Sequence, residues 1–279
     1  MPSLVDSHQQ LSGSAQDLLI IEEPLEIRLE FEGLTGPERR SIAVTMRTPG
    51  QDRELAVGFL VTEGILRSQD ELLEVSGCGP AQPPHGGQNI VRVKLRPGVV
   101  PDLGRMQRNF YATSSCGICG KASLDAVVAE GVEKVADVDW QVTPEFVCQL
   151  PEVIKAHQPI FSATGANHGA LLMSPAGEVL CCFEDVGRHN AVDKVIGAQF
   201  LSGKDWRERT AQSILVVSGR AGFELVQKAL VARIPVMVAI GAPSSLSVAL
   251  ASQFGMTLIG FVREARFNIY SGRGRVREY

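Results

Sequence analysis

The segment 214–262 reads ILVVSGRAGFELVQKALVARIPVMVAIGAPSSLSVALASQFGMTLIGFV, and it decides the fold. Short, mainly apolar runs alternate in it with stretches of helical spacing: 214–217, 223–232, 236–240, 245–253 and 257–262. Strands and helices that alternate at these lengths predict parallel strands joined by right-handed crossovers. We therefore expect an α/β sheet with helices packed against it.

The residues before this segment predict a hairpin that joins the same sheet. Two apolar runs, 170–173 and 179–183, flank a Ser-Pro-Ala-Gly turn. A helix is expected over 188–200, where apolar residues recur on one side. A hairpin that leads into strand–helix repeats predicts a mixed sheet with helices on both faces.

The N-terminal half predicts a smaller, β-containing part, so the chain is α+β overall. Alternating apolar residues indicate strands over 24–32 and 41–47, and a helix is expected over 54–66. Four glycines and three prolines predict a loop over 77–89. We expect four regions along the chain: a flexible tail (1–20), an N-terminal domain (21–157), the α/β domain (158–272) and a basic tail (273–279).

Composition limits the function. The apolar fraction of 44% and the charged fraction of 21% are typical of globular proteins. A net charge of −4 argues against a general binder of nucleic acid or of membrane surfaces. The sequence has neither an export signal nor an apolar run of about 18 residues, so we expect a cytoplasmic protein whose six cysteines are thiols.

Two of those cysteines form a CxxC motif in the stretch Thr113-Ser-Ser-Cys116-Gly-Ile-Cys119-Gly-Lys121. A thiolate is the nucleophilic form of cysteine, and a nearby lysine or several backbone amides lower a thiol pKa. The motif therefore suits thiol–disulfide exchange or a transient persulfide. A zinc half-site is the structural alternative, but it normally needs a second pair of ligands. The remaining cysteines form no second CxxC, so no metal site is predicted.

Polar residues follow several of the predicted strands. Arg188 and His189 begin the helix after the hairpin, and Ser218 and Arg220 follow the strand 214–217. Ligands of α/β sheets bind at the C-terminal ends of parallel strands, and arginine forks suit phosphate or carboxylate. The alternative is structural: Asp185 caps the helix while His189 packs beneath a loop.

Three further groups of residues could each have either a binding role or a structural role. His189 and Asp193 are four residues apart and could pair on one helix face. His168 could contact a ligand or be a satisfied loop histidine. Arginines are concentrated near the C-terminus and suit an anionic partner or a solvated face: Arg263, Arg266, Arg273, Arg275 and Arg277.

In four blocks, the sequence resembles the FdhD/NarQ family of formate dehydrogenase accessory sulfurtransferases over about residues 24–272. These blocks are Tyr111-Ala-Thr-Ser-Ser-Cys-Gly-Ile-Cys-Gly120, Glu184-Asp-Val-Gly-Arg-His-Asn-Ala-Val-Asp-Lys194, Ser218-Gly-Arg220 and Thr257-Leu-Ile-Gly-Phe-Val-Arg263. The resemblance implies a cytidine-deaminase-like fold. Deaminases require a His-x-Glu at a zinc site, and His189 has no glutamate two residues later, so zinc-dependent deamination is not expected.

The resemblance implies a function as well. The protein would accept sulfur as a persulfide from a cysteine desulfurase and pass it to the molybdenum bis-molybdopterin guanine dinucleotide cofactor, bound as a substrate, for formate dehydrogenase. Cys116 would carry the persulfide and Cys119 would assist. Cofactor-binding residues would be Phe261, Val262, Arg263, Glu264, Ala265, Arg266, Arg188, His189, Ser218 and Arg220.

Partners and alternatives follow from the same resemblance. We expect a homodimer that docks to the desulfurase and to formate dehydrogenase. Two other functions stay open: a thiol–disulfide oxidoreductase that cycles a Cys116–Cys119 disulfide, and a chaperone that binds the cofactor without catalysis. Loss or retention of formate dehydrogenase activity after Cys116→Ala would separate a sulfur carrier from a chaperone.

Overall fold

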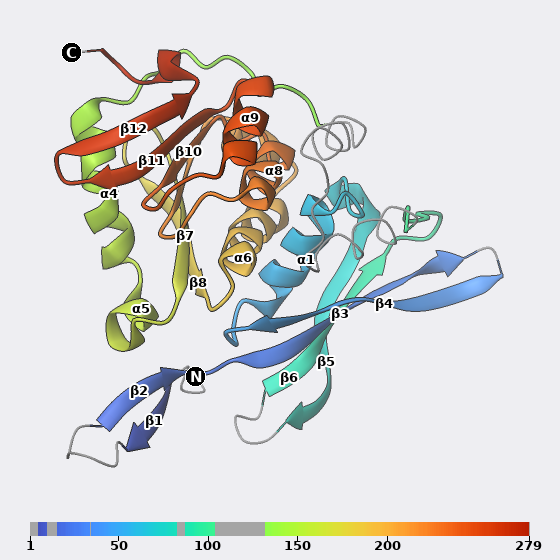
Figure 1. Ribbon diagram of the computed structural model, residues 1–279. Coiled ribbons are helices and arrows are strands. Elements are labelled where there is room, and N and C mark those ends of the chain that lie inside the picture. The colour runs from blue at the N-terminus through green and yellow to red at the C-terminus, as the bar shows by residue number, and fades with distance from the viewer. Residues whose placement is uncertain (1–4, 10–15, 34, 83–86, 104–131, 279) are drawn as a thin grey trace.

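The computed structural model describes residues 5–9, 16–33, 35–82, 87–103 and 132–278. A six-stranded sheet forms the centre of the C-terminal part (Figure 1). Its order is β12-β11-β10-β9-β7-β8, in which β9, β10 and β11 are parallel and the other pairs are antiparallel. The mixed sheet is therefore confirmed. Its strands are β7 (His168–Met173), β8 (Val179–Asp185), β9 (Ile214–Val217), β10 (Val236–Ala239), β11 (Thr257–Arg263) and β12 (Arg266–Ser271).

Helices cover both faces of this sheet, as predicted. In β9, Leu215 and Val217 pack in the core shared with α6, α8 and α9, whereas Ile214 and Val216 pack in the core shared with α4. A strand buried on both faces has no polar alternation, which explains its continuous apolar sequence. The helices of this part are α4 (Pro144–Ala156), α5 (Pro159–Thr164), α6 (Arg188–Leu201), α7 (Trp206–Thr210), α8 (Phe223–Val231) and α9 (Ser245–Gln253).

A four-stranded sheet forms the N-terminal part, in the order β4-β3-β6-β5. Leu25, Ile27 and Leu29 of β3 are fully buried and face the core beneath α1. The bounds are β3 (Glu23–Gly33), β4 (Gly36–Arg47), α1 (Asp52–Thr62), a short 3-10 helix (Gln69–Glu71), β5 (Leu72–Gln82) and β6 (Gly87–Leu95). A separate hairpin, β1 (Val5–Gln9) with β2 (Gln16–Ile20), lies within the segment predicted as a tail.

The loop predicted over 77–89 is wrong. β5 continues to Gln82 and β6 starts at Gly87, so strands occupy most of that range. The pairing register shifts between Cys78 and Ala81, and Gly79 has a positive φ of 94°. A bulge on an edge strand tolerates glycine and proline, which a continuous inner ladder would exclude.

The two parts are joined where α1 crosses α6. A Cβ at Gly58 would lie 1.8 Å from the carbonyl oxygen of Asp193, and a Cβ at Gly197 would lie 1.9 Å from that of Glu54. Side chains at either glycine would force the helices apart. One continuous core therefore includes residues of both sheets.

The C-terminal residues pack against the chain that precedes α4. Val276 is buried and forms a β-bridge with Val142, although it lies in the segment predicted as a basic tail. α4 packs against the six-stranded sheet through Val147 and Leu150, although it precedes the predicted boundary at 157/158. Among the described residues, no helix is long and apolar enough to span a membrane.

Candidate functional site

One edge of the six-stranded sheet brings together residues from five segments, which we call the strand-end row. His168 at the start of β7 pairs with Asp185 at the end of β8. The His168 ring also lies against Gly219, which follows β9. The backbone N–H of Gly241, after β10, donates to the carbonyl of Gly219 (2.9 Å), and the N–H of Phe261 donates to that of Gly241 (3.0 Å). The row thus runs Asp185, His168, Gly219, Gly241, Phe261.

Glycines keep the segments of the row in close contact. A Cβ at Gly241 would lie 2.9 Å from the carbonyl oxygen of Gly219 and 3.1 Å from Cα of Arg220. A Cβ at Gly219 would lie 3.2 Å from Nδ1 of His168. Only glycine allows this spacing without displacing a neighbour, so the loops after β9 and β10 are fixed relative to each other.

Ser218 is fixed beside the row by two hydrogen bonds. Its backbone N–H donates to the carbonyl of Gly169 (3.0 Å), and its Oγ accepts from the Gly169 N–H (2.8 Å). Because Oγ acts as an acceptor here, its own hydrogen can donate to an anion. The serine is therefore oriented before any ligand binds.

Positive charges converge on this edge. Burial lowers the pKa of His168, and the charges of Arg188, His189 and Arg220 lower it further, while Asp185 opposes them. Residues from two separate segments, the start of α6 and the loop after β9, therefore influence the pKa of the same imidazole. Such a concentration of cations attracts phosphate or carboxylate groups.

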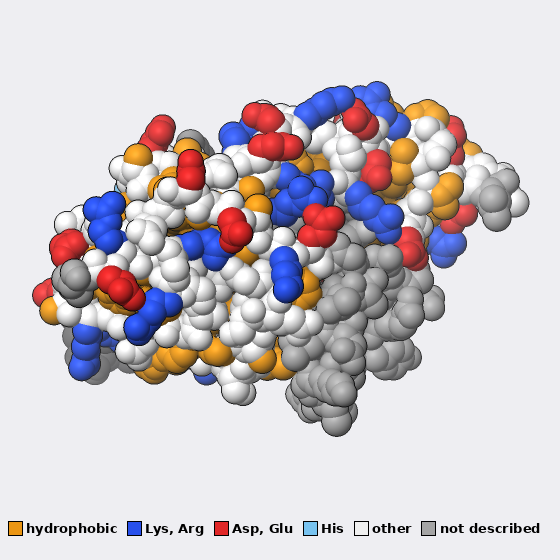
Figure 2. Space-filling view, turned by 90° about the horizontal axis from the view of Figure 1, so that it is seen from above, with side chains coloured by type: hydrophobic (Ala, Val, Ile, Leu, Met, Phe, Trp, Pro, Cys, Tyr) orange, Lys and Arg blue, Asp and Glu red, His pale blue; other side chains and the backbone are white. Residues whose placement is uncertain are grey.

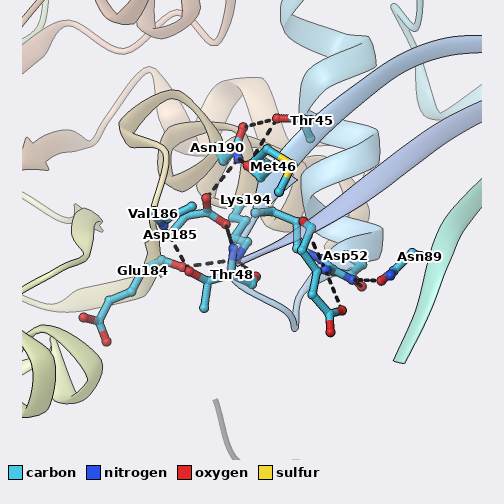
Figure 3. A network of polar contacts seen from close by, with 12 residues as sticks. Thr45, Met46, Thr48, Asp52, Asn89, Glu184, Asp185, Val186, Asn190 and Lys194 are labelled. Atoms are coloured by element: carbon cyan, nitrogen blue, oxygen red, sulfur yellow. Dashed lines mark hydrogen bonds and ion pairs between the residues drawn. The ribbon is translucent and has the colours of Figure 1, made fainter. Parts of the chain in front are cut away.

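A buried ion pair holds the start of α6, which carries two of these cations. Lys194 lies 2.8 Å from Asp185, and both side chains are fully buried (Figure 3). Asp185 also accepts hydrogen bonds from the N–H of Gly187 and from Nδ2 of Asn190, both at 2.9 Å. Gly187, and not Asp185, is the N-cap residue of α6. The same carboxylate accepts from the N–H of Thr48 (3.2 Å), which attaches this helix start to the end of β4.

The pairing considered between His189 and Asp193 is wrong. Nε2 of His189 lies 2.7 Å from Oε2 of Glu224, in the first turn of α8. Asp193 instead lies 2.9 Å from Nζ of Lys228 and accepts from the Thr62 hydroxyl (2.9 Å). These partners are distant in sequence, so spacing along α6 alone could not identify them.

Glu224 is a residue of this site that the sequence interpretation missed. The hydrogen bond from His189 lowers the pKa of its carboxyl, although burial acts in the opposite direction. Glu224 is therefore an anion beside the cations of the row. One sequence feature could have identified Glu224: it lies four residues after Arg220, in the first turn of the helix that follows a strand-end loop.

The residues of the segment Phe261–Arg266 differ in exposure, so they are not equally accessible to a ligand. Phe261 has a positive φ of 54° and a side chain that is 44% exposed. A left-handed conformation is costly for a bulky residue, and strain of this kind concentrates at binding sites. Val262 is fully buried in the core, whereas Glu264, Ala265 and Arg266 are exposed around the turn between β11 and β12.

Two of the C-terminal arginines make backbone contacts. Nη1 of Arg263 donates to the carbonyls of Ile240 (2.9 Å) and Val262 (2.7 Å), which places its guanidinium beside the loop after β10. Arg275 donates to the carbonyls of Gly255 (2.7 Å) and Ala136 (3.1 Å). Arg275 therefore attaches the C-terminal residues to the fold and has less freedom to bind an anion.

Cys116 and Cys119 lie outside the described residues. Among the described cysteines, burial raises the pKa of Cys148, that of Cys181 to about 11 and that of Cys182 to about 12. A raised thiol pKa lowers the thiolate fraction at neutral pH. These three cysteines are therefore poor nucleophiles at neutral pH.

Comparison with known proteins relates the chain as a whole to a family. The sequence profile of the FdhD/NarQ family matches residues 20–277. The chain is 48% identical over 263 residues to "Sulfur carrier protein FdhD" of Streptomyces coelicolor, which covers 93% of this chain and 89% of the relative. It is 43% identical over 264 residues to the protein of the same name from Mycobacterium tuberculosis, which covers 93% and 92%.

A solved structure supports the fold. The crystal structure of a protein assigned as a formate dehydrogenase accessory protein, from Desulfotalea psychrophila, matches with a TM-score of 0.69. The match covers 98% of this chain and 97% of that chain at 24% sequence identity. At this identity the likeness concerns the arrangement of the elements alone.

Proposed function

The chain belongs to the FdhD/NarQ family, and from that premise we propose that it is a sulfur carrier for the maturation of formate dehydrogenase. Sulfur would come from a cysteine desulfurase and pass to the molybdenum bis-molybdopterin guanine dinucleotide cofactor. The observation that carries the proposal is the 48% identity, over 93% of the chain, to a relative named as a sulfur carrier.

The thiol chemistry of the described cysteines supports Cys116 as the carrier. Cys181 and Cys182 are disfavoured as nucleophiles because burial raises their pKa to about 11 and about 12. Cys116 and Cys119 remain as the pair that combines CxxC spacing with an adjacent lysine, Lys121.

Transfer would proceed by thiol–persulfide exchange. The Cys116 thiolate attacks the outer sulfur of the desulfurase persulfide, so a new S–S bond forms on Cys116 and the desulfurase thiolate leaves. Cys119 then attacks the inner sulfur of the Cys116 persulfide, which releases the outer sulfur as sulfide and leaves a Cys116–Cys119 disulfide. The two electrons that reduce the released sulfur come from the two thiols, and a cellular dithiol reductant restores the pair.

The strand-end row supports binding of an anionic cofactor that contains guanine. Arg188, Arg220 and the hydroxyl of Ser218 could hold phosphate groups. The exposed ring of Phe261, at the other end of the row, is suited to stacking on a purine. The cofactor carries both kinds of group, so one edge of the sheet could bind it.

The proposal is tested in cells that lack their own copy of the protein. Cys116→Ala is expected to abolish formate dehydrogenase activity, whereas Cys182→Ala, a control at a half-buried thiol, is expected to retain it. Incubation of the purified Cys119→Ala variant with a desulfurase and cysteine should add one sulfur atom to Cys116, as measured by intact mass and peptide mapping, because this variant lacks the second thiol that would release the sulfur as sulfide.

Two outcomes favour other functions. Full activity of Cys116→Ala in cells would favour a cofactor chaperone. A Cys116–Cys119 disulfide in the wild-type chain, together with no sulfur adduct on Cys116 in Cys119→Ala, would favour an oxidoreductase. Either result would overturn the sulfur-carrier proposal.

A further inference from the structure

We infer that His168 is an additional ligand-binding residue of the strand-end row and that it contacts phosphate as a protonated imidazolium. The inference rests on the proposed function, because it assumes that the phosphates of a nucleotide cofactor bind along this edge. His168 would then set how the affinity for phosphate depends on pH.

The position of His168 favours such a contact. Its backbone lies between Asp185 and Gly219, and its ring lies against Gly219, with Nδ1 3.2 Å from the position of a Cβ there. The side chain is partly exposed. A ligand held by Ser218 and Arg220, which flank Gly219, would therefore lie close to the imidazole.

The groups around His168 favour its neutral form in the empty site. Cations face it from α6 (Arg188 and His189) and from the loop after β9 (Arg220). Burial is the largest cause of its lowered pKa, and these charges add to the effect. Asp185 on β8 is the carboxylate that opposes them.

Neighbouring acids are already engaged with other partners. Oδ1 of Asp185 accepts from Gly187 and Asn190, and Oδ2 lies 2.8 Å from Lys194. On α8, the carboxylate of Glu224 lies 2.7 Å from Nε2 of His189. Among the described residues these two acids are already paired, and a bound phosphate would offer His168 a negative group that is free to pair with it.

The sign of the pH effect follows from linkage. A phosphate beside the imidazole favours its protonated form, so the pKa of His168 is higher in the complex than in the empty protein. Binding then takes up a proton between those two pKa values. The affinity for phosphate is greatest when the pH is below the pKa of His168 in the empty protein. It falls as the pH rises from that pKa to the higher pKa of the complex, and it is constant at higher pH.

The experiment uses the full chain and inorganic pyrophosphate as the probe. The pKa of His168 is measured from its ring resonances by NMR, with and without saturating pyrophosphate, and His168→Gln identifies the signal. We expect a pKa below the ordinary histidine value in the empty protein and a rise of about one unit or more in the complex. His157→Gln is the control, because His157 is exposed at the end of α4.

Binding measurements complete the test. His168→Gln should weaken pyrophosphate binding by about threefold or more near pH 6 and leave it almost unchanged above about pH 8, where His168 of the wild type is neutral both with and without the probe. The comparison is made at equal pH, so protonation of pyrophosphate itself cancels.

The experiment distinguishes failure of the proposed cofactor site from failure of the role of His168 alone. If pyrophosphate does not bind the wild-type chain, this inference and the proposed cofactor site are both overturned. If pyrophosphate binds but the pKa of His168 is unchanged, or if His168→Gln binds equally at every pH, only the role of His168 is overturned.

Discussion

Nε2 of His189 lies 2.7 Å from Oε2 of Glu224, and this contact joins the first turn of α6 to the first turn of α8. It places one carboxylate beside a group of cations that would attract an anion. Glu224 would therefore compete with a bound phosphate for the same positive charges, and it also holds the imidazole of His189 in place.

Replacing Glu224 with glutamine tests this competition. Glu224→Gln removes the negative charge and keeps a similar shape, so pyrophosphate binding at neutral pH should tighten by about threefold. Isothermal titration calorimetry measures the change. Glu178→Gln is a matched control, because Glu178 is exposed in the turn at the opposite end of β7 and β8. Weaker binding by Glu224→Gln would contradict competition and indicate that orientation of His189 matters more.

A second prediction concerns the strained backbone of Phe261, where φ is 54°. Phe261→Gly relieves a left-handed conformation that costs a non-glycine residue about 1–2 kcal/mol. The free energy of unfolding, from urea titration, should therefore stay the same or increase by about 1 kcal/mol. Binding of guanosine monophosphate should weaken by about tenfold, because the stacking ring is lost.

Arg233 provides the control for Phe261. Its φ is 59°, and its side chain is exposed in an ion pair with Glu133. Arg233→Gly should gain similar stability and bind guanosine monophosphate as the wild type does. If Phe261→Gly also binds normally, the ring of Phe261 has no role in nucleotide binding.

The fold could be predicted from the sequence where burial is two-sided. Segments such as 214–217 and 236–239 are continuous apolar runs because both faces of the strand are covered. β5 was missed because its bulge around Gly79 places glycine and proline in an edge strand. A local sequence pattern identifies glycine and proline as turn residues. It does not show whether these residues instead belong to a bulged edge strand that pairs with a neighbouring strand.

The candidate site could be predicted only in part. Arg188, Ser218 and Arg220 stood out because they follow predicted strands, and parallel strands end at a common edge. The roles of Glu224 and of the buried Lys194 depend on which helices pack together. Such contacts arise from tertiary structure, so one sequence offers little indication of them.

A third prediction concerns thiol reactivity. At neutral pH a pKa of about 11 leaves roughly one Cys181 side chain in ten thousand as thiolate, and Cys182 has fewer still. Brief treatment with iodoacetamide at pH 7 should therefore label Cys116 and Cys119 and spare these two. Peptide mass spectrometry measures the labelling, and protein unfolded in denaturant is the control in which every cysteine reacts. Equal labelling of Cys181 and Cys116 in the folded chain would argue against a selectively reactive CxxC.

A fourth prediction concerns the ion pair between Asp185 and Lys194, which attaches α6 to its surroundings. Nζ of Lys194 also donates to the carbonyls of Thr48 and Glu184, both at 3.1 Å. Lys194→Met should lower the free energy of unfolding by about 3 kcal/mol, because it leaves the buried Asp185 carboxylate without its counter-charge.

The double variant separates charge from packing. Asp185→Asn combined with Lys194→Met removes both charges, so it should recover part of the loss in a urea titration. Asp185 also accepts from the backbone N–H groups of Thr48 and Gly187, and asparagine can keep one of these bonds through its carbonyl oxygen. Recovery should therefore be incomplete, and the start of α6 should become more mobile. Hydrogen exchange of the Ala191 N–H, which donates to the carbonyl of Gly187 (3.0 Å), should then be faster than in the wild type. Unchanged exchange there, together with full recovery of stability, would mean that the ion pair does not position the cations of the row.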